Sequence, residues 1–191
     1  MAYYKGTLEE LKHKVAQQLS EHRYQHCLRV AAYAKKLAEQ NGVDPEKAEV
    51  AGLVHDYAKE RSNEDFIKTI KEDKLDPELL NWGNAVWHGV VGAEMIRKEL
   101  GITDPEILDA VRQHTTGAGA NMSTLAKIVF MADYLETGRD FPGVEKAREI
   151  TDRDLDDGVR YQIQHTMNYL TSKGAPIYPK SLDTYNYWMT H

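Results

Sequence analysis

The chain has 191 residues, of which 41% are hydrophobic, and this suffices for one compact domain with a sizeable core. Thirty acidic against 24 basic residues give a formal net charge of -6, which argues against a protein that binds nucleic acid or an anionic membrane through bulk electrostatics. The single cysteine, Cys27, excludes an internal disulfide, and with no signal peptide or bilayer-length apolar run in view we expect a cytoplasmic protein.

Helical start and stop signals recur along the whole chain, whereas strand-like alternation between hairpin turns is hard to find, so an all-α fold is predicted. Thr7 with Glu10 forms a capping-box pattern, and Asp-Pro pairs at 44–45 and 104–105 predict two further helix starts. Other terminal signals are the caps Ser62 and Ser123 and the left-handed glycines Gly42, Gly101 and Gly174. The predicted helices cover residues 8–22, 23–41, 45–59, 63–73, 88–100, 105–115, 124–137, 143–150, 154–173 and 181–190.

Five of these helices carry a polar side chain on an otherwise apolar face. The small residues Ala48, Ala51 and Gly52 lead to His55 at helical spacing, and they would let neighbouring backbones approach closely. An unpartnered polar group in such a place costs about a few kcal/mol, and an ionised carboxylate costs more. With Asp56, which follows His55, the set comprises His26, His55, Asp56, His88, His114 and Asp133.

Taken singly, each histidine of this set is more simply explained as a core residue bonded to a backbone carbonyl. Five such positions together favour shared metal ions, because a cation compensates buried carboxylates and neutral imidazole is a common metal ligand. The mixed nitrogen and oxygen donors suit iron, manganese, zinc or nickel better than magnesium. Cys27 points away from His26 around the helix, and we interpret it as a small buried hydrophobic residue.

The order of these six residues resembles the HD-domain metal-dependent phosphohydrolase superfamily, in its binuclear variant with two extra histidines. The stretches "RYQHCLRVAAYAKKLAEQNGVDPEKAEVAGLVHDYAKE", "AVWHGVVGAEMIRKELG" and "FMADYLETGRDFPG" further resemble the YqeK-type bis(5'-nucleosyl)-tetraphosphatase (symmetrical) family over nearly the whole chain. The resemblance implies a single HD domain over residues 1–191, with a metal-binding core at about 20–140 and C-terminal helices 143–191 packed on it.

The resemblance also implies two metal ions, with iron favoured. One would be held by His26, His55, Asp56 and Asp133, and the other by His88, His114 and Asp56, so that Asp56 bridges and one helical turn delivers both His55 and Asp56. A metal-bridging hydroxide would then attack phosphorus, with Asp56 and Lys59 as catalytic residues. The expected substrate-binding residues are Arg23, Lys59, His88, Arg139 and, in the loop "TTGAGAN", Thr115, Thr116 and Gly117.

The preferred hypothesis is hydrolysis of diadenosine tetraphosphate into two nucleoside diphosphates. Three alternatives stay open: a phosphatase or phosphodiesterase acting on another nucleotide, a di-iron oxygenase with the same ligands, and a nucleotide sensor with structural metal. Simpler alternatives also remain for the expected substrate-binding residues: a solvated lysine at Lys59, surface arginines at Arg23 and Arg139, and a flexible connector at 115–121. Four histidines that lie on none of these apolar faces are predicted at the surface: His13, His22, His165 and His191. The aromatic tail "DTYNYW" is predicted to cover core and is a candidate homodimer surface.

Overall fold

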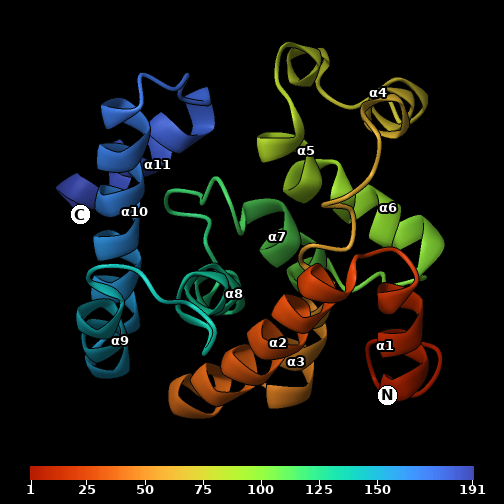
Figure 1. Cartoon of the computed structure of the whole chain (residues 1–191), viewed down its shortest axis with the longest axis horizontal. Helices are drawn as coiled ribbons and strands as arrows, with labels where there is room; N and C mark the ends of the chain where they lie inside the picture. The colour runs from red at the N-terminus through yellow and green to blue at the C-terminus, as the bar shows by residue number, and fades with distance from the viewer.

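The computed structural model describes residues 1–191, and its regular structure is entirely helical (Figure 1), which confirms the all-α prediction. The elements are α1 (Leu8–Ala16), α2 (Glu21–Asn41), α3 (Pro45–Val54), α4 (Asn63–Glu72), the 3₁₀ helix η1 (Pro77–Asn81), α5 (Asn84–Val90), α6 (Gly92–Glu99), α7 (Pro105–Gln113), α8 (Thr124–Leu135), α9 (Val144–Arg153), α10 (Leu155–Ser172) and α11 (Pro179–Thr190).

The centre of the molecule is formed by α2, α3, α7 and α8, with α9 to α11 gathered on one side in Figure 1. The predicted close approach of backbones is found between α2 and α3. A Cβ atom on Gly52 would lie 3.0 Å from Cα of Ala31 and 3.1 Å from the carbonyl oxygen of Val30, so a larger residue would push the two helices apart. This contact brings the end of α3, with the His55-Asp56 pair, against the helix that carries His26.

A second, smaller apolar cluster lies between α4, η1, α5 and α6, and it includes Phe66, Trp87 and Met95. Tyr178, which immediately precedes α11, is also part of it and is 6% exposed. The segment that joins α10 to α11 therefore contacts the elements around His88. That segment forms part of the wall of the cavity described below.

The predicted helix starts are confirmed at Thr7, where the full capping box with Glu10 is present, and at Asp44, Ser62, Asp104 and Ser123, whose side chains accept backbone hydrogen bonds. The left-handed glycines are confirmed as well, with φ of 68° at Gly42, 68° at Gly101 and 61° at Gly174. Local capping chemistry thus sets most of the helix boundaries.

Three predicted helices are wrong in their extent. The first, 8–22, is interrupted because Ser20 caps a new helix, α2. The helix predicted over 45–59 ends at Val54, and residues 55–60 form turns whose amides bond three residues back, as Tyr57 N does to Val54 O at 2.9 Å. The helix predicted over 88–100 is divided between α5 and α6. The break lies at Val91, next to Gly92, where a Cβ atom would lie 3.0 Å from Cβ of Ala58.

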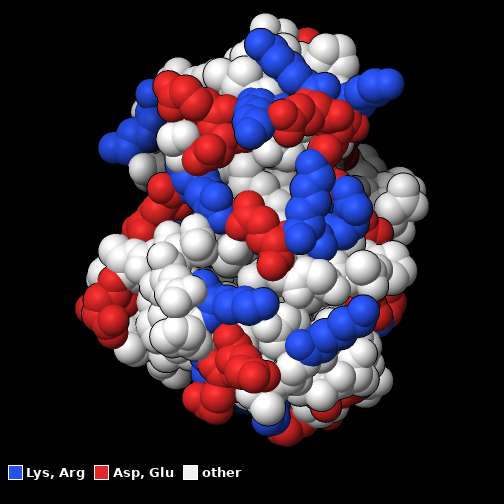
Figure 2. All heavy atoms as spheres, turned by 90° about the vertical axis from the view of Figure 1, so that its right-hand side faces the viewer, with Lys and Arg blue, Asp and Glu red and all other residues white.

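Charged side chains of both signs alternate over the face turned toward the viewer in Figure 2, which is the right-hand side of Figure 1. Surface charges of opposite sign are paired in the protein, as Arg97 is with Glu94 at 2.8 Å and Arg61 is with Glu99. This face therefore offers no continuous basic surface of the kind that binds nucleic acid. None of the helices has the length and apolar character that crossing a membrane requires.

Candidate metal centre and substrate site

Asp56 lies at the centre of the six predicted ligands and is 2% exposed. Its Oδ2 atom lies 3.6 Å from Nε2 of His55 and 3.8 Å from Nε2 of His26. Its Oδ1 atom lies 3.5 Å from Nε2 of both His88 and His114. Each carboxylate oxygen therefore faces its own pair of imidazole nitrogens, which is the arrangement that a bridging carboxylate requires.

The imidazole rings are oriented by hydrogen bonds through their other nitrogen. Nδ1 of His55, His88 and His114 lies 2.7 Å, 2.6 Å and 2.7 Å from a backbone carbonyl of Gly52, Asn84 and Val111, respectively. A carbonyl only accepts hydrogen bonds, so Nδ1 of each ring carries a proton, and in the neutral ring Nε2 keeps its lone pair. All three lone pairs thus belong to nitrogens that face Asp56.

These lone pairs favour a bound cation. Nε2 of His88 and Nε2 of His114 are only 3.0 Å apart, and two acceptors at that distance repel each other unless a proton or metal lies near them. Nε2 of His26 and Nε2 of His55 are buried without a hydrogen-bond partner. The donor set and these unpartnered atoms fit transition-metal ions well.

Asp133 completes the group from the last turn of α8. Its Oδ1 atom lies 3.1 Å from Nε2 of His26 and 3.7 Å from Nε2 of His55. Three triads of the cluster have ligand atoms within 4.8 Å of one another, namely His26 with His55 and Asp56, His55 with His114 and Asp133, and Asp56 with His88 and His114. All six predicted ligands therefore converge, and the His55-His114-Asp133 triad shows that the two predicted half-sites are contiguous.

Burial and neighbouring charge oppose each other in this cluster. Burial tends to raise the pKa of Asp56, but the His55 and His114 imidazoles outweigh it and hold the pKa well below its usual range. For His55, burial favours the neutral ring, yet the carboxylates of Asp56 and Asp133 leave its pKa raised. Burial and the adjacent His114 lower the pKa of His88 to about 3, so His88 is neutral and able to act as a ligand at physiological pH.

Cationic side chains border the cluster at the predicted positions. Arg23 donates from Nη1 to Oδ2 of Asp56 at 2.9 Å, and Arg139 donates from Nη2 to Oδ1 of Asp133 at 2.9 Å. Nζ of Lys59 lies 3.2 Å from Nε2 of His88, although the turn, and not the predicted continuation of the helix, carries it there. Burial lowers the pKa of Lys59 in spite of the Asp56 carboxylate.

Glu136 was not predicted, although it touches a predicted ligand directly. It is 2% exposed, and its Oε1 atom lies 3.2 Å from Nδ1 of His26. It also accepts hydrogen bonds from Nε of Arg29 at 2.6 Å and from the Gly138 amide at 2.5 Å. The signal was present, because Glu136 follows Asp133 by three residues and Arg29 follows His26 by three, so each lies on the ligand face of its helix.

The loop after His114 is held in place by α11. The indole Nε1 of Trp188 donates to the carbonyl of Ala118 at 2.9 Å, and a Cβ atom on Gly117 would lie 2.7 Å from the side chain of Thr184. Gly117, with φ of 64°, is buried against α11, which argues against its predicted contact with substrate. The flexible-connector alternative for this loop is disfavoured, and the prediction that the tail covers core is confirmed for Trp188, which is 5% exposed.

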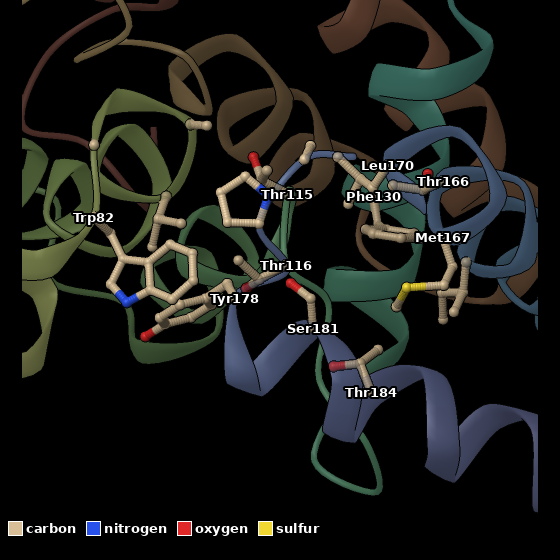
Figure 3. Close-up of a pocket in the computed structure, with 16 residues that line it drawn as sticks. Trp82, Thr115, Thr116, Phe130, Thr166, Met167, Leu170, Tyr178, Ser181 and Thr184 are labelled. Atoms are coloured by element: carbon tan, nitrogen blue, oxygen red, sulfur yellow. The ribbon is translucent and has the colours of Figure 1, made fainter. Parts of the chain in front are cut away.

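Thr115 and Thr116 of the same loop line a cavity of about 360 Å³ beside the cluster. Oγ1 of Thr115 lies 3.0 Å from Nε2 of His88, so the cavity and the ligand cluster are adjacent. Figure 3 shows Trp82 and Tyr178 on one side of the cavity, Met167 and Leu170 on the other, and the two threonines between them. Two predictions about residues outside the cluster are confirmed: Cys27 is buried, and His13, His22, His165 and His191 are exposed.

A family model for the HD domain matches residues 23–138. The symmetrical bis(5'-nucleosyl)-tetraphosphatase of Bacillus subtilis (strain 168) is 41% identical over 179 residues, which covers 94% of this chain and 96% of that protein. A protein of the same name from Halalkalibacterium halodurans is 44% identical over 168 residues, covering 88% of this chain and 89% of that protein. A crystal structure described as a predicted HD superfamily hydrolase involved in NAD metabolism, from Clostridium acetobutylicum, has a TM-score of 0.90 and 34% identity and covers 97% of this chain and 98% of that chain.

Proposed function

The chain belongs to the HD domain family, and on that basis we propose that it is a metal-dependent hydrolase that cleaves dinucleoside tetraphosphates symmetrically into two nucleoside diphosphates. The names of the Bacillus subtilis and Halalkalibacterium halodurans relatives support this substrate class, and both relatives match the chain over most of its length. The single structural observation that carries the proposal is Asp56, whose two oxygens face separate pairs of imidazole nitrogens.

The metal ligands in this proposal are those of the sequence analysis: His26, His55, Asp56, His88, His114 and Asp133. Two bound transition-metal ions would activate water for attack on phosphorus and offset charge on the phosphate oxygens. Iron is the proposed metal, with manganese, zinc and nickel as alternatives. A homodimer and a cytoplasmic location stay predictions.

The substrate phosphates would be bound by the cations that surround the cluster. Arg23 and Arg139 each form a short ion pair with a proposed ligand, Asp56 and Asp133, so their guanidinium groups are held in place before substrate arrives. Lys59 adds a third cation near His88 and, because most of its side chain is desolvated, its interaction with an anion is stronger than at the surface. These side chains concentrate positive charge locally in a protein whose formal net charge is -6.

The test is to incubate purified, metal-loaded protein with diadenosine tetraphosphate and to separate the products by chromatography. We expect ADP as the sole nucleotide product, while AMP with ATP would contradict symmetrical cleavage. Elemental analysis of the same preparation gives the metal content. A parallel panel of nucleoside monophosphates, cyclic dinucleotides and NAD addresses the alternative nucleotide hydrolases. The panel includes NAD because of the description of the Clostridium acetobutylicum protein.

Oxygen uptake by the reduced protein would instead favour the di-iron oxygenase, and tight nucleotide binding without turnover would favour the sensor. Neither alternative gains support from the relatives at 41% and 44% identity, both of which are named as hydrolases of a tetraphosphate.

A further inference from the structure

The segment between α8 and α9, residues 136–143, carries Arg139, and α9 lies beside α8 (Figure 1). These residues form no helix, and the turn at their start is closed by a backbone hydrogen bond from Arg139 N to Glu136 O at 2.9 Å. The last carbonyls of a helix also lack amide partners within it, so the end of α8 presents further acceptors. The position of Arg139 therefore depends on which groups bind this stretch of backbone.

Arg148, on α9, binds the backbone of this segment with a single guanidinium group. Its Nε atom donates to the carbonyl of Leu135 at 3.1 Å. Its Nη2 atom donates to the carbonyl of Glu136 at 3.0 Å and to that of Arg139 at 3.2 Å, while Nη1 pairs with Glu145. The side chain of Arg148 is only 20% exposed, so water has little access to these bonds. One side chain thus links the end of α8 to the residue that carries a proposed phosphate-binding group.

Resting on the proposed function, in which Arg139 binds substrate phosphate, we propose that Arg148 is the positioning residue for Arg139. It acts through the backbone, because none of the six proposed ligands accepts a hydrogen bond from it. With the main chain fixed, the Arg139 side chain turns back toward α8. There Nε donates to the carbonyl of Asp133 at 3.0 Å, and Nη2 donates to Oδ1 of Asp133 at 2.9 Å. Arg139 is thereby held against the ligand cluster although it lies outside any helix.

The chemistry of the guanidinium group explains why an arginine serves here. Its planar fork presents several N–H donors in fixed directions, so one group can reach three carbonyls, whereas a lysine ammonium acts as a point charge. Leu135 and Glu136 are 0% and 2% exposed, so their carbonyls would lose a partner in a place that water reaches poorly. Without Arg148 the chain would have to move to hydrate them. A shift of about 1 Å in a positioned group can cost about a hundredfold in rate.

Arg139 and Arg148 both lie beyond residues 23–138, the stretch that the HD family model matches. The proposed metal ligands are inside that stretch, whereas this phosphate-binding guanidinium and its support follow it directly. A purely structural role for Arg148 would be to fix α9 on α8. Its loss would then weaken the protein equally with or without the Arg139 side chain, and this difference makes the two roles separable.

The experiment is a double-mutant cycle between Arg148→Ala and Arg139→Ala. Calorimetry measures the affinity of the metal-loaded full chain for inorganic pyrophosphate. Arg153→Ala is the matched control, because Arg153 lies on the same helix with a 73% exposed side chain and an ion pair of 4.0 Å to Asp157. Arg148→Lys, which keeps the charge but not the fork, replaces Arg148→Ala should that variant fold poorly. Melting temperature and metal content verify that each variant is folded and loaded.

We expect Arg139→Ala to weaken pyrophosphate binding at least about tenfold, and Arg148→Ala to weaken it at least about fivefold. In the Arg139→Ala background, Arg148→Ala should weaken binding by less than about twofold, because no phosphate-binding side chain remains to be positioned. Arg153→Ala should leave the affinity unchanged. Equal losses in the two backgrounds, or no loss from Arg148→Ala in the folded and metal-loaded protein, would overturn the positioning role.

The cycle does not depend on turnover, so its failure is distinguishable from failure of the proposed function. A parent chain that cleaves diadenosine tetraphosphate but shows equal losses in the two backgrounds would keep the proposed function and refute the role of Arg148. A parent chain that does not cleave it, but in which the effect of Arg148→Ala depends on Arg139, would refute the proposed function and support the positioning of a phosphate-binding arginine.

Discussion

Replacing Glu136 by glutamine tests whether the hydrogen bond to His26 supports metal binding. Glutamine keeps the shape of the side chain but only one accepting oxygen, whereas Glu136 accepts from Arg29, Gly138 and His26. At least one of these donors must lose its partner, and His26 loses a neighbouring negative charge. Removing an outer partner of a ligand histidine lowers metal affinity by roughly 10–100-fold, which corresponds to about 1.4–2.7 kcal/mol.

The assay is a competition between protein and a chelator of known affinity, with bound metal measured by elemental analysis. Glu49→Gln is the matched control, because Glu49 also pairs with a cation of α2, Lys35, at 2.9 Å but lies away from the ligands. We expect Glu136→Gln to lose metal at a chelator concentration at least about tenfold lower than the parent and the control. If the two variants lose metal at the same concentration, Glu136 serves only the packing of α8 on α2, and the reasoning is refuted.

Three further substitutions test the metal site and the packing of the surrounding helices separately. Asp56→Asn should lower turnover by at least about a thousandfold while circular dichroism still reports a helical fold, because the amide cannot bridge two cations. Gly89→Ala should lower the melting temperature and the metal content, since its Cβ would lie 3.0 Å from the Val111 carbonyl oxygen and 3.3 Å from the His114 ring, a clash that costs about 1–3 kcal/mol. Glu94→Gln should lose about 1 kcal/mol of unfolding free energy at neutral pH, with Arg112 its main partner. The ion pairs lower the pKa of Glu94 in the folded state, so the stability that Glu94 contributes is present at pH values above its pKa in the unfolded chain. Denaturation curves recorded at successively lower pH should therefore show the difference in unfolding free energy between the parent and Glu94→Gln vanish.

Features set by local chemistry could be predicted from the sequence. Helix starts at Thr7, Asp44 and Asp104 depend on side chains that cap their own backbone, and the ligand residues follow the apolar periodicity of their helices. The convergence of the six ligands was predicted because several buried polar groups needed a common partner.

Features set by tertiary contact could not be predicted in the same way. No glycine or proline marks the end of α3 at Val54, and the break near Gly92 depends on Ala58, which lies more than thirty residues earlier in the chain. The cavity joins Trp82 to Met167 and Tyr178, a juxtaposition for which the sequence carries no periodic signal. The 3₁₀ helix η1 is a different case, because Asp76-Pro77 carries the same start signal as the two Asp-Pro pairs that were used.

The ends of α3 and α7 explain why the ligand histidines stand where they do. The last carbonyls of a helix lack an amide partner within it, and His55 and His114 each occupy the C-cap position of their helix. Their Nδ1–H groups donate to Gly52 and Val111, three residues earlier, so each ring both caps its helix and directs Nε2 at Asp56. The negative ends of two helix dipoles therefore point toward the cluster, which favours bound cations there. Extending α3 by even one turn would remove the free carbonyl that orients His55, so the early end of this helix is a requirement of the site.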